Sequence, residues 1–209
     1  MPMPGWHQIA LLTLAYLLGG VSPGYLLVRW RTGLDVRTTG SGGTGATNVG
    51  RLLGRPGYAA VFVLDLAKGA FIGWVARHYA VSDAWAYAAA FTVVLGHVFP
   101  VWLGFRGGKG VGPFVGAWLV LAPLALIPSL ILGLVFLAWL RKFSIAGLFG
   151  LFVLPAAAWW VTDSRAAVVN ACVTISLLLW SHRRNLRTFA EERLRAAEAP
   201  APQAPTHSP

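Results

Sequence analysis

The sequence is poor in acidic residues and contains almost no cysteine. Its 209 residues include seven Asp and Glu against 17 Lys and Arg, and Cys172 is its one cysteine. A single thiol excludes an internal disulfide framework. The patterns His-Glu-x-x-His, Cys-x-x-Cys and Gly-x-Ser-x-Gly are also absent, which argues against a metal site and a covalent serine mechanism. No metal and no cofactor are expected.

Apolar residues dominate the chain instead. They make up 56% of it, and the mean hydropathy is +0.63. These values indicate an all-α integral membrane protein rather than a soluble domain. The net charge of +10 is carried by loops between apolar runs, where basic residues set topology and attract anionic lipid or phosphate. Membrane lipid is thus an expected partner, and nucleic acid is not.

The long apolar run 113–140 decides the topology. It contains Pro123 and Pro128, and if it turns near Ala122, almost every basic loop residue lies on one face. Only Arg77 and Arg165 then lie on the other. The positive-inside rule therefore favours about seven transmembrane helices, some short, with the N-terminus outside and the C-terminus inside. The expected spans are 6–28, 57–76, 84–103, 113–121, 123–140, 144–161 and 166–181.

The spans are predicted to form one domain, followed by a tail. Residues 1–195 are expected to be a single transmembrane catalytic domain. Residues 196–209 are rich in Ala and Pro, a composition that favours disorder.

Two glycine-rich loops stand between the apolar runs. The first, 40–48, reads Gly-Ser-Gly-Gly-Thr-Gly-Ala-Thr-Asn and precedes Arg51, and the second, 104–110, contains Lys109. Glycines let backbone N–H groups converge on an anion, and a helix starting near Val49 would point its positive end at the same place. The simpler interpretation is that the glycines only turn the chain at a membrane surface. Because both loops carry a cation on one predicted face, we favour two phosphate cradles.

Ionisable residues at the spans admit two interpretations. Asp65 and Lys68 are three apart and share a helical face, which favours a buried ion pair that holds helices together over direct catalysis. The pattern His78-x-x-x-x-Asp83 matches one used by acyl-CoA-dependent glycerolipid acyltransferases. It falls on the outer face of the predicted topology, so we interpret it as an interfacial loop.

Further polar residues lie near the cytoplasmic ends of the spans. His97 is close to the end of the third span. His182 and Asn185 are three apart where the last span leaves the membrane, so both can face the cradles. Ser144 is interpreted either as a helix cap or as a contact to a substrate hydroxyl.

At these residues the sequence resembles the bacterial acyl-phosphate:glycerol-3-phosphate acyltransferases. The resemblance runs from about residue 10 to residue 189 and rests on the order and spacing of its motifs. These are Gly40-Ser41-Gly42-x-x-Gly45-Ala46-Thr47-Asn48-x-x-Arg51, Leu64-Asp65-x-x-Lys68-Gly69, Gly96-His97-x-Phe99-Pro100 with Gly107-Gly108-Lys109-Gly110-Val111, and His182-Arg183-x-Asn185.

The resemblance implies a seven-span enzyme of the bacterial inner membrane with its active site on the cytoplasmic side. It implies transfer of a fatty acyl group from acyl phosphate, without acyl-CoA, to the first hydroxyl of glycerol 3-phosphate, giving lysophosphatidic acid. Two phosphorylated substrates would account for two cradles. The residues implied as catalytic are Lys109, Arg51, His182 and Asn185. Those implied as substrate-binding are Ser41, Gly42, Gly45, Ala46, Thr47, Asn48, His97, Gly107, Gly108, Gly110 and Ser144.

The implied reaction favours a substrate-assisted mechanism. The leaving phosphate has a pKa near neutrality and can accept the proton of the attacking hydroxyl, while Lys109 and Arg51 would stabilise the developing charge. We favour this hypothesis over a histidine base because no carboxylate is spaced to orient His97 or His182.

The sequence departs from the family at positions beside both cradles. Gly43 stands where the family usually has Asn, and Gly112-Pro113 stand where it usually has Ala-Thr. A Gly-x-Glu-x-Lys-like ending is replaced by residues 190–193, Ala-Glu-Glu-Arg. These changes keep two alternatives open. One is a paralogue with another acceptor or low activity, and the other is a non-catalytic carrier or binder of a phosphorylated lipid or metabolite.

Overall fold

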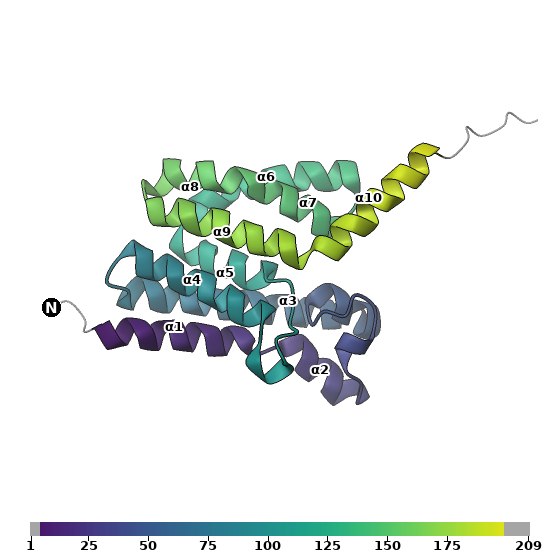
Figure 1. The fold of residues 1–209 in the computed structure, drawn as a ribbon, viewed down its shortest axis with the longest axis horizontal. Coiled ribbons are helices and arrows are strands. Elements are labelled where there is room, and N and C mark those ends of the chain that lie inside the picture. Colours follow the sequence, from purple (N-terminus) through teal and green to yellow (C-terminus); the bar gives the residue numbers. More distant parts are fainter. Residues whose placement is uncertain (1–4, 199–209) are drawn as a thin grey trace, which may run out of the picture.

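A computed structural model describes residues 5–198, which form helices joined by short loops (Figure 1). Helices such as α1, α4 and α9 run along the length of one bundle. Helices satisfy their backbone N–H and C=O groups internally, as a lipid environment requires. The predicted all-α architecture is confirmed.

The elements follow one another closely along the chain. The last of them reaches Glu198, so residues 199–209 of the predicted tail lie outside the described residues. In order, the α-helices and the short 3₁₀ helices (η) are α1 (Gly5–Gly20), α2 (Pro23–Thr32), η1 (Val36–Thr38), α3 (Ala46–Tyr79), α4 (Asp83–Val98), η2 (Val101–Leu103), α5 (Val111–Leu121), α6 (Pro123–Leu140), α7 (Phe143–Gly150), η3 (Leu151–Val153), α8 (Leu154–Thr162), α9 (Arg165–Ser181) and α10 (Arg183–Glu198).

The first predicted span is present but interrupted between α1 and α2. Ser22 caps α2, its hydroxyl accepting a hydrogen bond from the backbone of Tyr25 at 3.4 Å, and a proline follows at the first helical position. The ammonium of Lys68 donates to the carbonyl oxygens of Gly19 and Val21 at 3.0 and 2.8 Å. These carbonyls are released where α1 ends, so Lys68 stabilises the break.

The first long loop is shorter than predicted. The expected spans 6–28 and 57–76 leave residues 29–56 between them, but α2 continues to Thr32 and α3 begins at Ala46, before the expected start near Val49. The first turns of α3 form a segment of their own, because Gly54 has φ 69° and ψ −166°, a conformation that only glycine adopts readily. The N-terminus of α3 therefore lies directly after the first glycine-rich loop.

The predicted break in the run 113–140 is confirmed. α5 ends at Leu121 and α6 begins at Pro123, with Ala122 between them in a non-helical conformation. Along α6, Val135 and Trp139 are 59% and 71% exposed. An exposed apolar face of this extent is typical of a helix that faces hydrocarbon.

The described residues contain five helical segments long and apolar enough to cross a membrane. They are Gly5–Thr32, Ala46–Tyr79, Asp83–Leu103, Pro123–Leu140 and Phe143–Thr162. The bent pair α9 and α10 raises this number to six, and α5 is a shorter apolar helix. The prediction of about seven spans and the predicted orientation of the two termini stay predictions.

The helices α3 and α5 pack closely through small residues. A Cβ at Gly69 would overlap the backbone of Pro113, and a Cβ at Gly116 would overlap the backbone of Leu66. Such positions let two helix backbones approach each other. The approach places Asp65 of α3 beside Gly112 in the first turn of α5, where a Cβ would lie 2.8 Å from the Cβ of Asp65.

Candidate active site

The two glycine-rich loops meet at one end of the bundle. The backbone N–H of Thr44 in the first loop donates to the carbonyl of Gly107 in the second at 3.4 Å. A cavity of about 420 Å³ opens beside this contact. The sequence-predicted site residues that line it are Ser41, Gly45, Ala46, Thr47, Asn48, His97, Lys109, Gly110, Ser144 and His182.

Five other predicted site residues lie around the cavity rather than in its wall. Arg51 is exposed on the first turns of α3, and its charge acts on Lys109. Gly107 and Gly108 donate their backbone N–H groups to the carbonyls of residues 98 and 97 at the end of α4. Gly42 turns the first loop with φ 71°, and Asn185 is half-buried on α10.

Three helix N-termini converge on the cavity. The first turns of α3, α5 and α7 contribute Thr47, Val111 and Ser144 to its wall. Each N-terminus carries unpaired backbone N–H groups and the positive end of a helix dipole. Gly110 precedes α5 with φ 92°, a left-handed conformation that suits glycine. Together these ends make a site that attracts anions.

One buried side chain holds the first loop in shape. The amide nitrogen of Asn48 donates to the carbonyl oxygens of Val36, Thr39 and Gly43 at 2.9 to 3.0 Å. Its amide oxygen accepts the N–H of Ser41 at 3.0 Å. Asn48 is 2% exposed. Its polar atoms therefore bind the loop itself, which places the hydroxyl of Ser41 at the cavity wall.

The second loop lies on the end of α4 and is tied to α9. The hydroxyl of Ser181 donates to the carbonyl of Lys109 at 2.9 Å. The side chain of Lys109 is half-buried in the cavity wall. Burial and, to a smaller extent, the nearby positive charge of Arg51 lower its pKa to about 8. Lys109 is thus a partly desolvated cation next to three helix N-termini.

A buried polar cluster stands behind the second loop. The ammonium of Lys68 lies 2.9 Å from the Oδ1 atom of Asp65 and 2.8 Å from the Nδ1 atom of His97. The same Nδ1 atom lies 3.5 Å from the Oδ1 atom of Asp65, so the three side chains form one cluster. Nε2 touches the second loop, because a Cβ at Gly108 would overlap it. The predicted ion pair between Asp65 and Lys68 is confirmed, and it reaches the cradle through His97.

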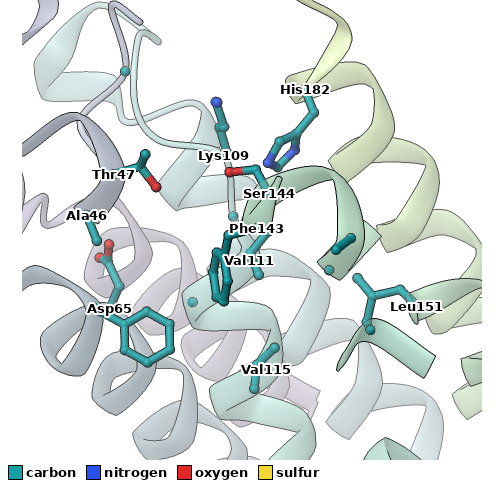
Figure 2. A pocket seen from close by; sticks show the side chains of 18 of the residues that line it. Ala46, Thr47, Asp65, Lys109, Val111, Val115, Phe143, Ser144, Leu151 and His182 are labelled. Atoms are coloured by element: carbon teal, nitrogen blue, oxygen red, sulfur yellow. The ribbon is translucent and has the colours of Figure 1, made fainter. Parts of the chain in front are cut away.

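His182 presents a neutral ring to the cavity. Its Nδ1 atom lies 2.8 Å from the carbonyl of Leu178, so Nδ1 carries the proton and Nε2 is free to accept. Burial, together with a smaller contribution from the charge of Lys109, lowers the pKa of His182 to about 4. Figure 2 shows Lys109, Ser144 and His182 gathered around one part of the cavity, with Thr47 facing them.

Most of the remaining cavity wall is apolar, although Tyr58, Asp65 and Ser129 also line it, and the sequence did not assign these residues to the cavity. Phe143 and Val115 extend its wall away from the polar groups (Figure 2). Further apolar lining residues are Phe62, Val111, Leu126, Leu130, Leu134, Leu137 and Leu151. Residues that line a cavity and residues that face lipid are both apolar, so the sequence of an apolar run does not distinguish them. Only the placement of α6 and α7 around the same cavity as α3 and α5 could identify them.

The pattern formed by His78 and Asp83 lies far from the cavity. It spans the connection between α3 and α4, at the end of the bundle opposite α2 and α10 (Figure 1). The Nδ1–H group of His78 donates to the carbonyl of Trp74 in its own helix at 2.8 Å. This location agrees with the interpretation as an interfacial loop.

The fold and the cavity define an integral membrane protein with an anion-attracting pocket at one end of its helix bundle. The family model described as glycerol-3-phosphate acyltransferase matches residues 9–192. A glycerol-3-phosphate acyltransferase of Geobacter metallireducens is 40% identical over 193 residues, covering 90% of this chain and 98% of that protein. One from a Synechococcus strain is 37% identical, covering 92% and 94%. The chain therefore belongs to the glycerol-3-phosphate acyltransferase family, as the motifs predicted.

Two solved structures of PlsY (YgiH), an integral membrane glycerol 3-phosphate acyltransferase, have the same fold. The glycerol 3-phosphate form is 30% identical with a TM-score of 0.83, covering 90% of this chain and 94% of that one. The lysophosphatidic acid form is 29% identical with a TM-score of 0.80, covering 90% and 93%. The predicted integral membrane fold is thereby confirmed.

Proposed function

We propose that this protein transfers a fatty acyl group from acyl phosphate to the first hydroxyl of glycerol 3-phosphate, giving lysophosphatidic acid. The reaction would take place at the cytoplasmic face of a bacterial inner membrane. One observation carries the proposal: a single cavity combines three helix N-termini and Lys109 with an apolar wall. This combination suits a phosphorylated acceptor beside an amphiphilic phosphorylated donor. The solved PlsY forms with glycerol 3-phosphate and lysophosphatidic acid support this acceptor and this product.

The polar residues divide into cations and hydroxyls. Lys109 and Arg51 would neutralise the two phosphates, and the N–H groups of residues 45–47 and 110–112 would bind their oxygens. Ser41, Thr47 and Ser144 would donate to phosphate or glycerol oxygens from the cavity wall. Asn185, one turn beyond His182, would approach the acceptor from the rim. The apolar wall would hold the acyl chain.

In the proposed step, the first hydroxyl of glycerol 3-phosphate attacks the acyl carbonyl carbon. A carbon–oxygen ester bond forms, and the bond between the acyl carbon and the phosphate oxygen breaks. The hydroxyl proton passes to the departing phosphate, whose second pKa is about 6 in a phosphate ester. No other proton acceptor is needed. Lys109 and the helix N-termini stabilise the charge that develops on the leaving group.

His182 is better suited to orient the acceptor than to remove its proton. A ring with a pKa of about 4 is a weak base near neutral pH. Its free Nε2 can accept a hydrogen bond from a glycerol hydroxyl, because Nδ1 is held by the carbonyl of Leu178. This arrangement supports the substrate-assisted mechanism.

The test is an assay of the purified protein with labelled palmitoyl phosphate and glycerol 3-phosphate. We expect lysophosphatidic acid with palmitoyl phosphate and none with palmitoyl-CoA. Lys109→Ala should lower kcat/KM by about 10²- to 10³-fold, the usual loss for one charge-stabilising donor. Arg165→Ala, at the opposite end of the bundle, is the control and should keep the parent rate. Equal rates for Lys109→Ala and the parent would refute the site.

A second candidate is an acyl-phosphate transferase with a different acceptor. Gly43 lines the cavity and leaves open a position where the family usually carries an Asn side chain. A panel of polyol phosphates in the same assay distinguishes the two, because a higher kcat/KM for another polyol phosphate would favour the second. Binding of acyl phosphate without turnover of any acceptor would instead indicate a carrier.

A further inference from the structure

The C-terminal helix α10 leaves the bundle directly after the cavity. α9 and α10 meet at 63°, and Figure 1 shows α10, in yellow, directed away from the other helices. His182 at the bend lines the cavity. Glu192 of α10 forms an ion pair of 2.8 Å with Lys142, the residue before α7. α10 is thus anchored at the same end of the molecule as the cavity.

One side of α10 is apolar and continues past the bundle. Leu186, Ala190 and Leu194 follow at four-residue spacing and share a helical face. Leu186 packs against the core of the bundle, whereas Leu194, two turns later, is 63% exposed. The apolar stripe is therefore covered by the bundle at Leu186 and uncovered at Leu194, among the described residues.

The remaining surface of α10 carries excess positive charge. Its two glutamates with described side chains are already paired, Glu191 with Arg187 and Glu192 with Lys142. Two of the other arginines lie over aromatic rings, at 4.1 and 5.5 Å from the ring centroids of Trp180 and Phe189. Within the described part of the chain, no acidic side chain pairs with the exposed arginines Arg183, Arg184, Arg193 and Arg195.

We propose that α10 is a docking surface for anionic phospholipid. Its apolar stripe enters the boundary between headgroups and acyl chains, and its arginines bind lipid phosphates on either side of the stripe. Basic amphipathic helices take this position on membranes, and a juxtamembrane arginine cluster favours anionic lipid. Neutral lipid would leave the arginines without counter-charges. A second copy of the chain would bring like charges together.

The surface is distinct from the cavity and does not depend on the proposed reaction. Its four arginines and Leu194 are not part of the cavity lining. Asn185 in the first turn of α10 is the one described residue of this helix with a role in the proposed acyl-transfer step, and lipid contact through the arginines and Leu194 does not involve it. A failure of the lipid test would therefore leave the proposed function unchanged, and the reverse holds as well.

The test places an environment-sensitive fluorophore on the apolar stripe of the full-length protein, as L194C in a C172S background. The protein is reconstituted in phosphatidylcholine vesicles with and without phosphatidylglycerol. With phosphatidylglycerol, the emission of the fluorophore is expected to shift to the blue. The fluorophore should also become accessible to a lipid-attached quencher. The same label at T188C, on the polar side of the helix, should keep water-like emission in both vesicles.

The arginines are tested in the same labelled protein. R193Q/R195Q should lower the ratio of docked to undocked helix about 25-fold, because each arginine near an anionic surface contributes about fivefold. R165Q at the far end of α9 is the control and should change nothing. The proposal is overturned if the Leu194 label stays in water with phosphatidylglycerol, if R193Q/R195Q leaves the shift unchanged, or if the shift rises with protein density as a second copy would require.

Discussion

The two glycine-rich loops have similar compositions but are held by different means. Asn48, one buried side chain at the end of the first loop, binds that loop through four backbone contacts. The second loop rests on the end of α4 and on the ring of His97, behind which stand Lys68 and Asp65. The residue that holds the first loop is close to it in sequence, whereas the residues behind the second loop come from two helices, α3 and α4. Backbone groups of a loop that are buried away from water need hydrogen-bond partners within the protein, and the two loops obtain them in these two ways.

The ion pair behind the second loop gives the largest expected effect on stability. Lys68→Met leaves the Asp65 carboxylate buried without its partner, and breaking such a pair costs about 3–5 kcal/mol. We expect a clear fall in the thermal-unfolding midpoint in detergent. The double variant Asp65→Asn/Lys68→Met removes the unpaired carboxylate and should recover that part of the loss only, because the carbonyls of Gly19 and Val21 still lack their donor. A Lys68→Met midpoint equal to that of the parent would show that the pair does not support the fold.

The support of the first loop is tested by Asn48→Ala. This change leaves the carbonyls of Val36, Thr39 and Gly43 without their donor, at a cost of about 1–3 kcal/mol. We expect a higher KM for glycerol 3-phosphate or acyl phosphate, because the loop loses its shape. Asn48→Asp keeps the acceptor for the N–H of Ser41 but sets a buried carboxylate oxygen against the three carbonyls, so it should be no better than Asn48→Ala. Unchanged kinetics in Asn48→Ala would mean that the loop is held by its glycines alone.

The cations of the two loops are coupled through their charges. The pKa of Lys109 falls from its ordinary value of 10.5 to about 8 through burial and the charge of Arg51. The protonated amine attracts phosphate, so kcat/KM should be level below this pKa and fall as pH rises through about 8. Arg51→Gln removes the like charge beside Lys109. The decrease in kcat/KM should then occur at higher pH, although kcat/KM on the low-pH plateau is lower than in the parent. Identical pH profiles for both proteins would contradict this coupling.

The smallest expected effect comes from filling the open position in the first loop. A Cβ at Gly43 would lie 3.8 Å from the carbonyl of Gly107 and 3.9 Å from the hydroxyl of Ser41, without strain. Gly43→Asn adds a donor to the cavity wall and should lower the KM for a phosphorylated substrate by about two- to tenfold. Gly43→Ala adds no donor and should match the parent. A higher KM in Gly43→Asn than in Gly43→Ala would show that this sequence needs the open space.

Much of the architecture was predictable because its causes are local. The break at Ala122 followed from two prolines and from the distribution of basic residues, and α5 and α6 confirm it. The interruption after α1 was missed, although Ser22 and the proline after it form a recognisable helix start. The early start of α3 at Ala46 was also missed, since the glycines before it favour a longer loop.

The candidate site was predictable as a set of motifs but not as a set of contacts. Sequence spacing brought Ser41, Lys109 and His182 into one hypothesis, and all three line the same cavity. Sequence spacing gave no means of separating residues that face the cavity from residues that hold the loops around the cavity in place. Asn48 was predicted to bind substrate, yet its polar atoms bind the loop. The roles of the lining residues in binding and catalysis stay predictions.

The amino-acid sequence by itself determined that this chain is helical, membrane-embedded and a member of its family, because hydropathy, glycine clusters and motif order are properties of neighbouring residues. The tertiary structure alone decided that Gly107 meets Thr44, that His97 stands behind Lys109's loop, and that apolar side chains of α6 complete the cavity. These relations depend on how closely α3, α5 and α6 approach one another. That distance is set by the packing of side chains far apart in the chain, which no local pattern encodes.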